Sequence, residues 1–308
     1  MTFQVARIEG FDVVVPTRSE ALFAAGSISK FVTALGALLL VDRGVLELDA
    51  DVRGTTLRAL LGHTSGASVE FFPGYARGAQ LPTIDDVLAG HAPATNEPVQ
   101  LDDEARGAFR YSGGGYALVQ RMVEDAVRVP FARAMHDAVL SPLGMHDSTF
   151  EQPLPSALHS RVTRDDWHVY PEAAAAGLWT TPMDLARAVA AVQAALVGVP
   201  SVVPRRVALA MTVPQAEVPQ SSDIEAIREL GLAPPEEVGL GVFLSAGGTR
   251  FGHLGGAHGF TSAFDVSATD GTGVVVMSDV HNGFEVVLPQ VVEALAERVG
   301  APVGTWRA

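Results

Sequence analysis

The sequence predicts an α+β protein, in which an antiparallel sheet flanked by helices is interrupted by a mostly helical insertion. Two short β-rich runs occupy residues 3–8 and 11–15, close to the N-terminus. Residues 51–170 have helix-and-loop character, with several breaks that contain proline. Four successive β-like runs, separated by glycine-containing turns, then fall between residues 238 and 280. The strands therefore come from both ends of the chain.

The order of these regions predicts two domains. Residues 1–50 and 171–308 would build one sheet domain, and residues 51–170 would form a mostly helical inserted subdomain. The length of 308 residues suits a core domain that carries an insertion. Hydrophobic residues at 48% with charged residues at 18% indicate a globular chain.

The N-terminal elements are a hairpin and a long helix. A Glu-Gly pair separates the two β-rich runs, as a hairpin turn would. In "SISKFVTALGALLLVDRG", Phe31 and Leu35 recur at helical spacing, and Gly44 suits a C-terminal cap. This pattern predicts a helix that begins at Ser27.

The C-terminal half combines three helices with the four strands. A Thr-Pro pair begins the first helix, and a proline-rich connection separates it from the second. We expect helices over 182–196, 222–230 and 284–299, and strands over 238–246, 249–257, 260–268 and 271–280.

Composition excludes several classes of function. A formal net charge of −14 argues against nucleic acid and anionic membrane surfaces as partners. The absence of cysteine excludes disulfides, thiol nucleophiles and thiolate metal sites. The N-terminus lacks the basic start and apolar run of a secretory signal, and the apolar runs are too short to span a membrane. We therefore expect a cytoplasmic protein if the chain is complete; a trimmed chain could be exported.

Lys30 is the only lysine of the chain, against twenty arginines. A guanidinium stays protonated at any working pH, whereas a buried amine can lose its proton and act as a base. Ser27 lies three residues earlier, so both side chains share one helix face. A serine hydroxyl is a weak nucleophile unless a base takes its proton, and a neutral Lys30 could be that base.

Other chemistries lack their motifs. No serine has glycines at both −2 and +2, so the nucleophile elbow of α/β-hydrolases is missing. The residue before the only lysine is Ser29, which excludes a P-loop. His253 and His258 are five residues apart beside glycines, a spacing that fits loop histidines better than a metal site. We expect no metal and no cofactor.

Two later stretches offer partners for the Ser-Lys pair. "RYSGGGY" places Tyr111 and Ser112 directly before a glycine turn and a helix. "HLGGAHGF" places His253 and two glycines where a strand meets a turn. A flat glycine segment lets a substrate approach the backbone and lets an N–H group point at a developing oxyanion.

The order Ser-x-x-Lys, Tyr-Ser-x and a basic residue followed by x-Gly resembles the penicillin-recognising serine enzymes, which include serine β-lactamases, DD-peptidases and related esterases. "LLGHTSG", "SPLGM" and "GLGVFL" also resemble landmarks of that family. The resemblance runs from about residue 22 to the last helix. It implies a β-lactamase/transpeptidase-like fold and the class C-like branch, with its esterases and D-aminopeptidases.

The resemblance also implies roles for individual residues. Ser27 would be the acylated nucleophile and Lys30 its hydrogen-bonded base. Tyr111 matches the tyrosine that shares the proton transfer in the class C-like branch.

Substrate binding would fall to the last two motifs. Ser27 and Gly256, in the Gly255-Gly256 pair, would supply the N–H groups of the oxyanion hole. Ser112 could donate a hydrogen bond to substrate. A partly charged His253 could position a carboxylate or orient Tyr111.

Two positions depart from the family pattern. Gly113 stands where the family has the asparagine of Tyr-x-Asn, and Leu254 stands where Lys-Thr-Gly has its threonine. Both changes remove polar contacts to β-lactam and peptidoglycan amides. His-x-Gly variants occur among the esterases and D-amino-acid peptidases of the family.

These observations predict a serine hydrolase that acts through a Ser27 acyl-enzyme on an ester or amide of a small or short peptide-like substrate. The alternatives are a β-lactamase, a D-aminopeptidase or transacylase of the same fold, and a scaffold that binds penicillin or peptide without turnover. The sequence leaves the acyl group, the deacylation route and the oligomeric state open.

Overall fold

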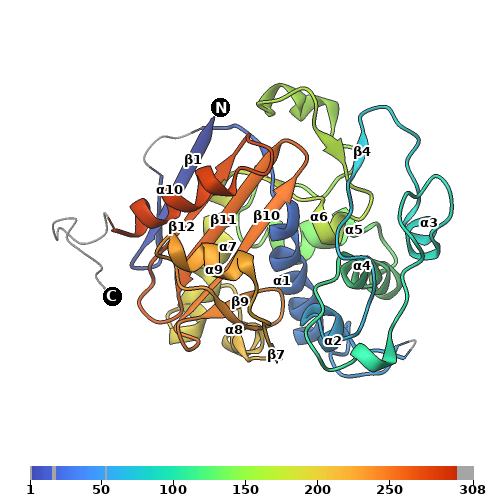
Figure 1. Ribbon diagram of the computed structural model, residues 1–308, viewed down its shortest axis with the longest axis horizontal. Helices are drawn as coiled ribbons and strands as arrows, with labels where there is room; N and C mark the ends of the chain where they lie inside the picture. Colours follow the sequence, from blue (N-terminus) through green and yellow to red (C-terminus); the bar gives the residue numbers. More distant parts are fainter. Residues whose placement is uncertain (1, 16–18, 53, 297–308) are drawn as a thin grey trace.

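The computed structural model describes residues 2–15, 19–52 and 54–296 (Figure 1). Its described strands form one eight-stranded sheet, in the order β2-β1-β12-β11-β10-β9-β8-β7, and two small two-stranded sheets. All pairs in the large sheet are antiparallel. The strands are β1 (Phe3–Glu9), β2 (Asp12–Val14), β3 (Phe23–Ala24), β4 (Tyr75–Ala76), β5 (His168–Val169), β6 (Trp179–Thr180), β7 (Ala216–Glu217), β8 (Pro235–Val238), β9 (Phe243–Ser245), β10 (Arg250–Ala257), β11 (Phe260–Ser267) and β12 (Gly273–Ser278).

The helices fall into a group that flanks the large sheet and a group in the middle of the chain. The α-helices are α1 (Ser29–Asp42), α2 (Leu57–Leu61), α3 (Ile84–Ala89), α4 (Gly113–Val127), α5 (Phe131–Met135), α6 (Ala173–Ala176), α7 (Pro182–Val197), α8 (Arg205–Thr212), α9 (Ser222–Glu229) and α10 (Phe284–Ala296). The 3-10 helices are η1 (Gly26–Ile28), η2 (Asp103–Ala105) and η4 (Ser156–Arg161), and η3 (His136–Leu140) is a π-helix that continues α5.

Helices cover both faces of the large sheet (Figure 1). On one face α10 packs against β11 and β12, with Val287 and Leu288 in the buried cluster. On the other face α7 packs against β1, β2 and β12. The same face receives α1, whose Phe31 ring lies 5.0 Å from that of Phe264. The sheet is therefore the middle layer of three.

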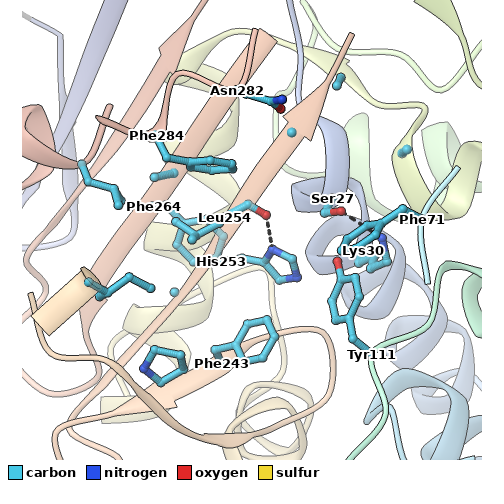
Figure 2. A pocket seen from close by; sticks show the side chains of 18 of the residues that line it. Ser27, Lys30, Phe71, Tyr111, Phe243, His253, Leu254, Phe264, Asn282 and Phe284 are labelled. Carbon is cyan, nitrogen blue, oxygen red and sulfur yellow. Dashed lines mark hydrogen bonds between the residues drawn. The ribbon is translucent and has the colours of Figure 1, made fainter. Parts of the chain in front are cut away.

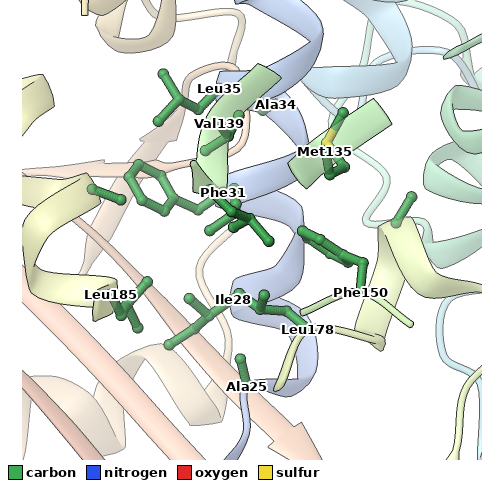
Figure 3. Close-up of a cluster of buried hydrophobic side chains, with 14 of the residues drawn as sticks. Ala25, Ile28, Phe31, Ala34, Leu35, Met135, Val139, Phe150, Leu178 and Leu185 are labelled. Carbon is green, nitrogen blue, oxygen red and sulfur yellow. The ribbon is translucent and has the colours of Figure 1, made fainter. Parts of the chain in front are cut away.

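Helix α1 lies at the centre of the main core (Figure 3). Every residue from Ser29 to Leu40 is buried, as expected for a helix that is apolar on all sides. Figure 3 shows its Phe31 and Leu35 among side chains from other helices, including Met135. Gly36 allows this packing, since a Cβ atom there would lie 2.7 Å from the Met135 sulfur.

Hydrogen bonds tie α1 to the segment around α6. Thr33 Oγ1 donates to the Ala174 carbonyl at 2.9 Å, and the Leu178 N–H donates to Ser29 Oγ at 2.9 Å. All four groups are buried, so these bonds fix how α6 sits against the first turns of α1.

The structure confirms the predicted fold class and corrects three elements. The run 238–246 was predicted as one strand, which is wrong: β8 ends at Val238 and β9 begins at Phe243. Between them Gly241 has φ +75°, and a Cβ atom there would lie 2.4 Å from Ala34 Cβ. The chain turns here because α1 lies directly beneath it.

The second correction is α8, which we had interpreted as a proline-rich connection. Pro204 is the N-cap residue directly before Arg205, a place where its missing N–H removes no intrahelical hydrogen bond. The third is the short strand β7, which was not predicted. The predicted last helix is described only as far as Ala296, and residues 297–299 lie outside the described part of the chain. The division into domains at residues 50 and 170 stays a prediction.

In the part of the chain that the structure describes, no helix has both the length and the apolar character needed to cross a bilayer. The cellular location stays a prediction.

Candidate active site

Ser27 lies in η1, directly before α1, and its side chain lines a large pocket. The residue before it, Gly26, has φ +52° and packs on β10. A Cβ atom at Gly26 would lie 2.4 Å from the carbonyl oxygen of Gly256. Only glycine fits this contact, which holds Ser27 beside the end of β10.

Lys30 lies one turn further along the same helix face and is buried, with 2% exposure. Its Nζ donates to Ser27 Oγ at 3.1 Å and to the Ala175 carbonyl at 2.8 Å. Burial lowers the pKa of Lys30 from 10.5 to about 7. A neutral amine keeps two N–H donors and gains a lone pair, so it can still donate to Ala175 while it accepts the Ser27 proton.

Tyr111 lies on the other side of this amine, with Lys30 Nζ 5.0 Å from the centre of its ring (Figure 2). Burial raises the pKa of the Tyr111 phenol above its ordinary value, and an interaction with the Ser27 hydroxyl offsets part of that rise. The phenol is therefore protonated near pH 7. It can donate a proton, whereas Lys30 is the group that can accept one.

His63 holds Tyr111 in place. The two rings stack, with centroids 4.4 Å apart and planes 28° apart. His63 Nδ1 accepts the N–H of Ser112 at 3.1 Å, and its carbonyl accepts the N–H of Arg110 at 2.8 Å. The residues on both sides of Tyr111 are thus bound to His63. Burial lowers the pKa of His63 well below 6.5, so its imidazole is neutral.

Ser112 has a structural position. Its Oγ accepts the Gly115 N–H at 2.8 Å as the N-cap of α4, and it donates to the Ser68 carbonyl at 2.7 Å. The side chain is buried, with 1% exposure. Its single proton is already used, so the predicted donation to substrate is not supported by this geometry.

His253 lies within β10, inside the predicted strand 249–257 and not in a loop as its spacing from His258 had suggested. Its Nδ1 contacts the Leu254 carbonyl at 2.6 Å, and its Nε2 has no hydrogen-bond partner among the described residues. Burial and the nearby Lys30 charge lower its pKa to about 3. The prediction of a partly charged imidazole is therefore wrong. His253 is neutral at pH 7 and cannot attract a carboxylate as a cation would.

The edge of β10 faces Ser27. β9 pairs with β10 only as far as Gly252, so no described strand pairs with residues 253–257 on that side. The Thr249 carbonyl accepts the N–H of Ala268, directly after β11, and backbone groups alternate along a strand. The N–H of Gly256, an odd number of residues away, therefore points to the free edge beside Ser27.

Gly255 and Gly256, the two glycines of this edge, differ in the space that a side chain would find. At Gly255 a Cβ atom would lie 2.1 Å from the Ala25 carbonyl, so the contact with the segment before Ser27 excludes a side chain. At Gly256 a Cβ atom would find only the Phe284 ring, at 3.8 Å. Gly256 is exposed to the pocket.

The pocket has a volume of about 1040 Å³ and is mostly apolar. Phe71 and Phe243 stand on the Tyr111 side, with Phe71 66% exposed (Figure 2). Lys30 is the only lysine or arginine among the described residues that line the pocket.

Residues 4–296 match the family model described as Beta-lactamase. The chain belongs to the β-lactamase family.

Among curated proteins, the chain is 33% identical over 149 residues to penicillin-binding protein 4 of Amycolatopsis lactamdurans, covering 44% of this chain and 37% of that protein. It is 30% identical over 147 residues to penicillin-binding protein 4* of Bacillus subtilis (strain 168), covering 43% and 31%. The matches span well under half of each relative's own length. Among solved structures, the D-amino acid amidase from Ochrobactrum anthropi SV3 superposes with a TM-score of 0.71 at 20% identity, covering 96% of this chain and 95% of that one.

For this member of the β-lactamase family, the structure brings Ser27, Lys30, Tyr111, His253 and Gly256 together around one pocket. Sequence reasoning missed Gly26, the backbone partner of Lys30 at Ala175 and the stacking of His63 on Tyr111. The role of Gly26 could have been predicted, because a glycine directly before a helix start often marks a close backbone approach. The other two are contacts between distant segments, and no local pattern encodes them.

Proposed function

We propose that the chain is a serine hydrolase that forms an acyl-enzyme at Ser27 with an ester or amide substrate. The observation that carries this proposal is the buried amine of Lys30, 3.1 Å from Ser27 Oγ and with a pKa lowered to about 7. Half of a population with that pKa is neutral at pH 7, so a base is available where the nucleophile needs one.

Acylation would proceed by three proton transfers. Lys30 accepts the Ser27 hydroxyl proton as Oγ attacks the carbonyl carbon, and the carbonyl π electrons move onto oxygen. The N–H groups of Ser27 and Gly256 stabilise that oxyanion. As the tetrahedral intermediate collapses, the bond to the leaving group breaks. Its oxygen or nitrogen takes a proton from the Tyr111 phenol, and Lys30 then returns its proton to Tyr111.

Deacylation repeats the steps with water. Water attacks the acyl carbon and gives a proton to Lys30; the bond between that carbon and Ser27 Oγ then breaks, and Oγ takes this proton from Lys30. The carboxylic acid product is released and the site returns to its starting protonation. An amine in place of water would give an amide by the same route, and this acceptor is the alternative that product analysis must separate.

The electrostatics of the pocket favour neutral substrates. β-Lactams and peptidoglycan stem peptides carry a carboxylate close to the reacting amide. Lys30 is the only lysine or arginine in the described lining, and it is engaged with Ser27. A neutral His253 and an apolar Leu254 stand at the positions of the family's Lys-Thr-Gly. These features support a neutral ester or amide over a β-lactam.

The test is the intact mass of the protein after mixing with p-nitrophenyl butyrate and, separately, with a cephalosporin. We expect a transient butyryl adduct that is absent in Ser27→Ala. Ser29→Ala is the matched control, because Ser29 lies two residues away and only binds the Leu178 N–H; it should retain the adduct. A lasting adduct from the cephalosporin alone would replace the proposal with a penicillin-binding scaffold. An adduct that persists in Ser27→Ala would refute the assigned nucleophile.

A further inference from the structure

The pocket extends to the face of β10 opposite to His253. Side chains alternate along a strand, so His253 faces the main core while Leu254 faces α10. We call this part of the pocket the apolar arm. It is lined by Ile227, Leu230, Leu232, Leu254, Phe284 and Leu288.

The apolar arm is continuous with the site of the reaction. Residues of both belong to the lining of one pocket, and Gly256, exposed on the free edge of β10, borders both parts. On one side its carbonyl lies against Gly26, and on the other a Cβ atom at Gly256 would meet the Phe284 ring at 3.8 Å, so the glycine leaves room there that a side chain would fill. Figure 2 shows Phe284 and Leu254 across β10 from Ser27, whereas Tyr111 lies with Lys30 on the same side of β10 as Ser27.

The walls of the arm are apolar but incompletely packed. Ile227, Leu232 and Leu254 pack against the cluster under α10, yet each stays only partly buried. The described lining contains three carboxylates, those of Glu70, Asp265 and Glu285, and Asp265 is paired with Arg250 at 2.8 Å; its only lysine or arginine is Lys30. The arm therefore offers apolar contact and no free cation for an acid group. Its chemical complement is an uncharged hydrocarbon chain.

We propose that the apolar arm binds the acyl chain of a medium-chain ester or amide whose carbonyl is attacked by Ser27. This inference rests on the proposed function. The acyl part is assigned to the arm because Gly256, the expected oxyanion donor, borders Phe284 of the arm. The leaving group must instead face Tyr111, which supplies its proton.

The test is the dependence of kcat/KM on chain length across p-nitrophenyl acetate, butyrate, octanoate and decanoate. Each buried methylene contributes roughly a three- to fourfold gain, so the octanoate should exceed the acetate at least tenfold. Ile227→Trp fills the arm and should lower the octanoate-to-acetate ratio at least tenfold. Leu230→Trp is a second filling variant. Glu229→Trp is the matched control on the same helix, outside the lining, and should leave the ratio unchanged.

Binding without turnover separates this inference from the proposed function. Calorimetry of Ser27→Ala with octanamide and butanamide should show at least tenfold tighter binding of octanamide, lost in Ser27→Ala/Ile227→Trp. If esters acylate Ser27 but the series is flat and the tryptophan variants change nothing, the arm is refuted and the hydrolase stands. If octanamide binds as expected but no ester acylates Ser27, the hydrolase fails and the arm stands as a binding site.

Discussion

The two faces of β10 differ in what they leave unsatisfied. On one face His253 is buried, its Nε2 has no hydrogen-bond partner in the described part of the chain, and burial lowers the pKa of the nearby Lys30 amine to about 7. On the other face Leu254 and Ile227 are apolar, partly exposed and border open space. Burial of the polar groups on the first face costs electrostatic free energy. The apolar side chains on the second face lack some of the hydrophobic contacts that full packing would give them.

The difference between the two faces of β10 indicates which property of the protein each face determines. Buried polar groups that cost stability persist where the surrounding structure holds them for chemistry. Unfilled apolar surface gains contacts when a ligand fills it. We infer that the first face determines whether a substrate reacts and the second determines which substrate binds. Mutations should therefore separate the two effects.

The largest expected effect follows from Lys30→Arg. Arginine keeps the charge but cannot lose its proton, so kcat/KM for p-nitrophenyl acetate should fall by about a thousandfold. Thr33→Val is the matched control: Thr33 lies one turn further on α1 and also binds the α6 segment, at Ala174. It should keep activity within about threefold. If Lys30→Arg retained most of the activity in a folded protein, the base would have to be another group.

The pH dependence should report the same amine. Because the lowered pKa of Lys30 is about 7, the neutral base is lost as the pH falls through 7. We expect kcat/KM to fall about fiftyfold from pH 7 to pH 5, with a limiting slope of about tenfold per pH unit at the acid end, and to level off above pH 8. Rates should be corrected with Ser27→Ala at each pH.

His253→Asn sharpens this measurement, because a histidine is the other group whose ordinary pKa lies near 7. His253 is already neutral there, with a pKa of about 3, so its replacement should leave the midpoint of the acid limb unchanged. If the fall in kcat/KM at acid pH disappeared in His253→Asn, the titrating group would be His253. The roles inferred above for the two faces of β10 would then be wrong.

Much of the fold was predictable because its signals are local. The hairpin, α1, α7, α9 and the strands β10 to β12 follow from apolar periodicity and glycine turns, and each is found in the structure. The turn at Gly241 was missed because its cause is the contact with Ala34, a residue far away in the chain. The helix α8 was missed because a proline that starts a helix looks like one that breaks it.

The candidate site was predictable to the level of residue types and spacing. The proximity of Ser27 and Lys30 follows from one helix turn, and the structure has it. The charge of His253 was not predictable, because its pKa depends on burial and on the distant Lys30. The Ser112 hydroxyl likewise donates its proton to the Ser68 carbonyl. This contact joins distant segments, so the spacing of residues in the sequence could not predict it.

The smallest of the expected effects concerns His63, which we infer to be a positioning residue for Tyr111. Its φ of +56° is one that asparagine tolerates better than most residues. His63→Asn can keep this conformation and an acceptor for the Ser112 N–H, but it removes the ring that stacks on Tyr111. We expect kcat to fall about tenfold because the phenol is less precisely held, with KM for p-nitrophenyl acetate nearly unchanged.

His63→Phe makes the complementary change, since it keeps a ring against Tyr111 but removes the acceptor. If stacking is what positions the phenol, this variant should retain more kcat than His63→Asn at equal thermal stability. The acid limb of the pH profile should stay in place in both, because the base is Lys30. A rise in KM with kcat unchanged would show that His63 shapes the pocket and does not position Tyr111, so the polar face would then contribute to binding as well.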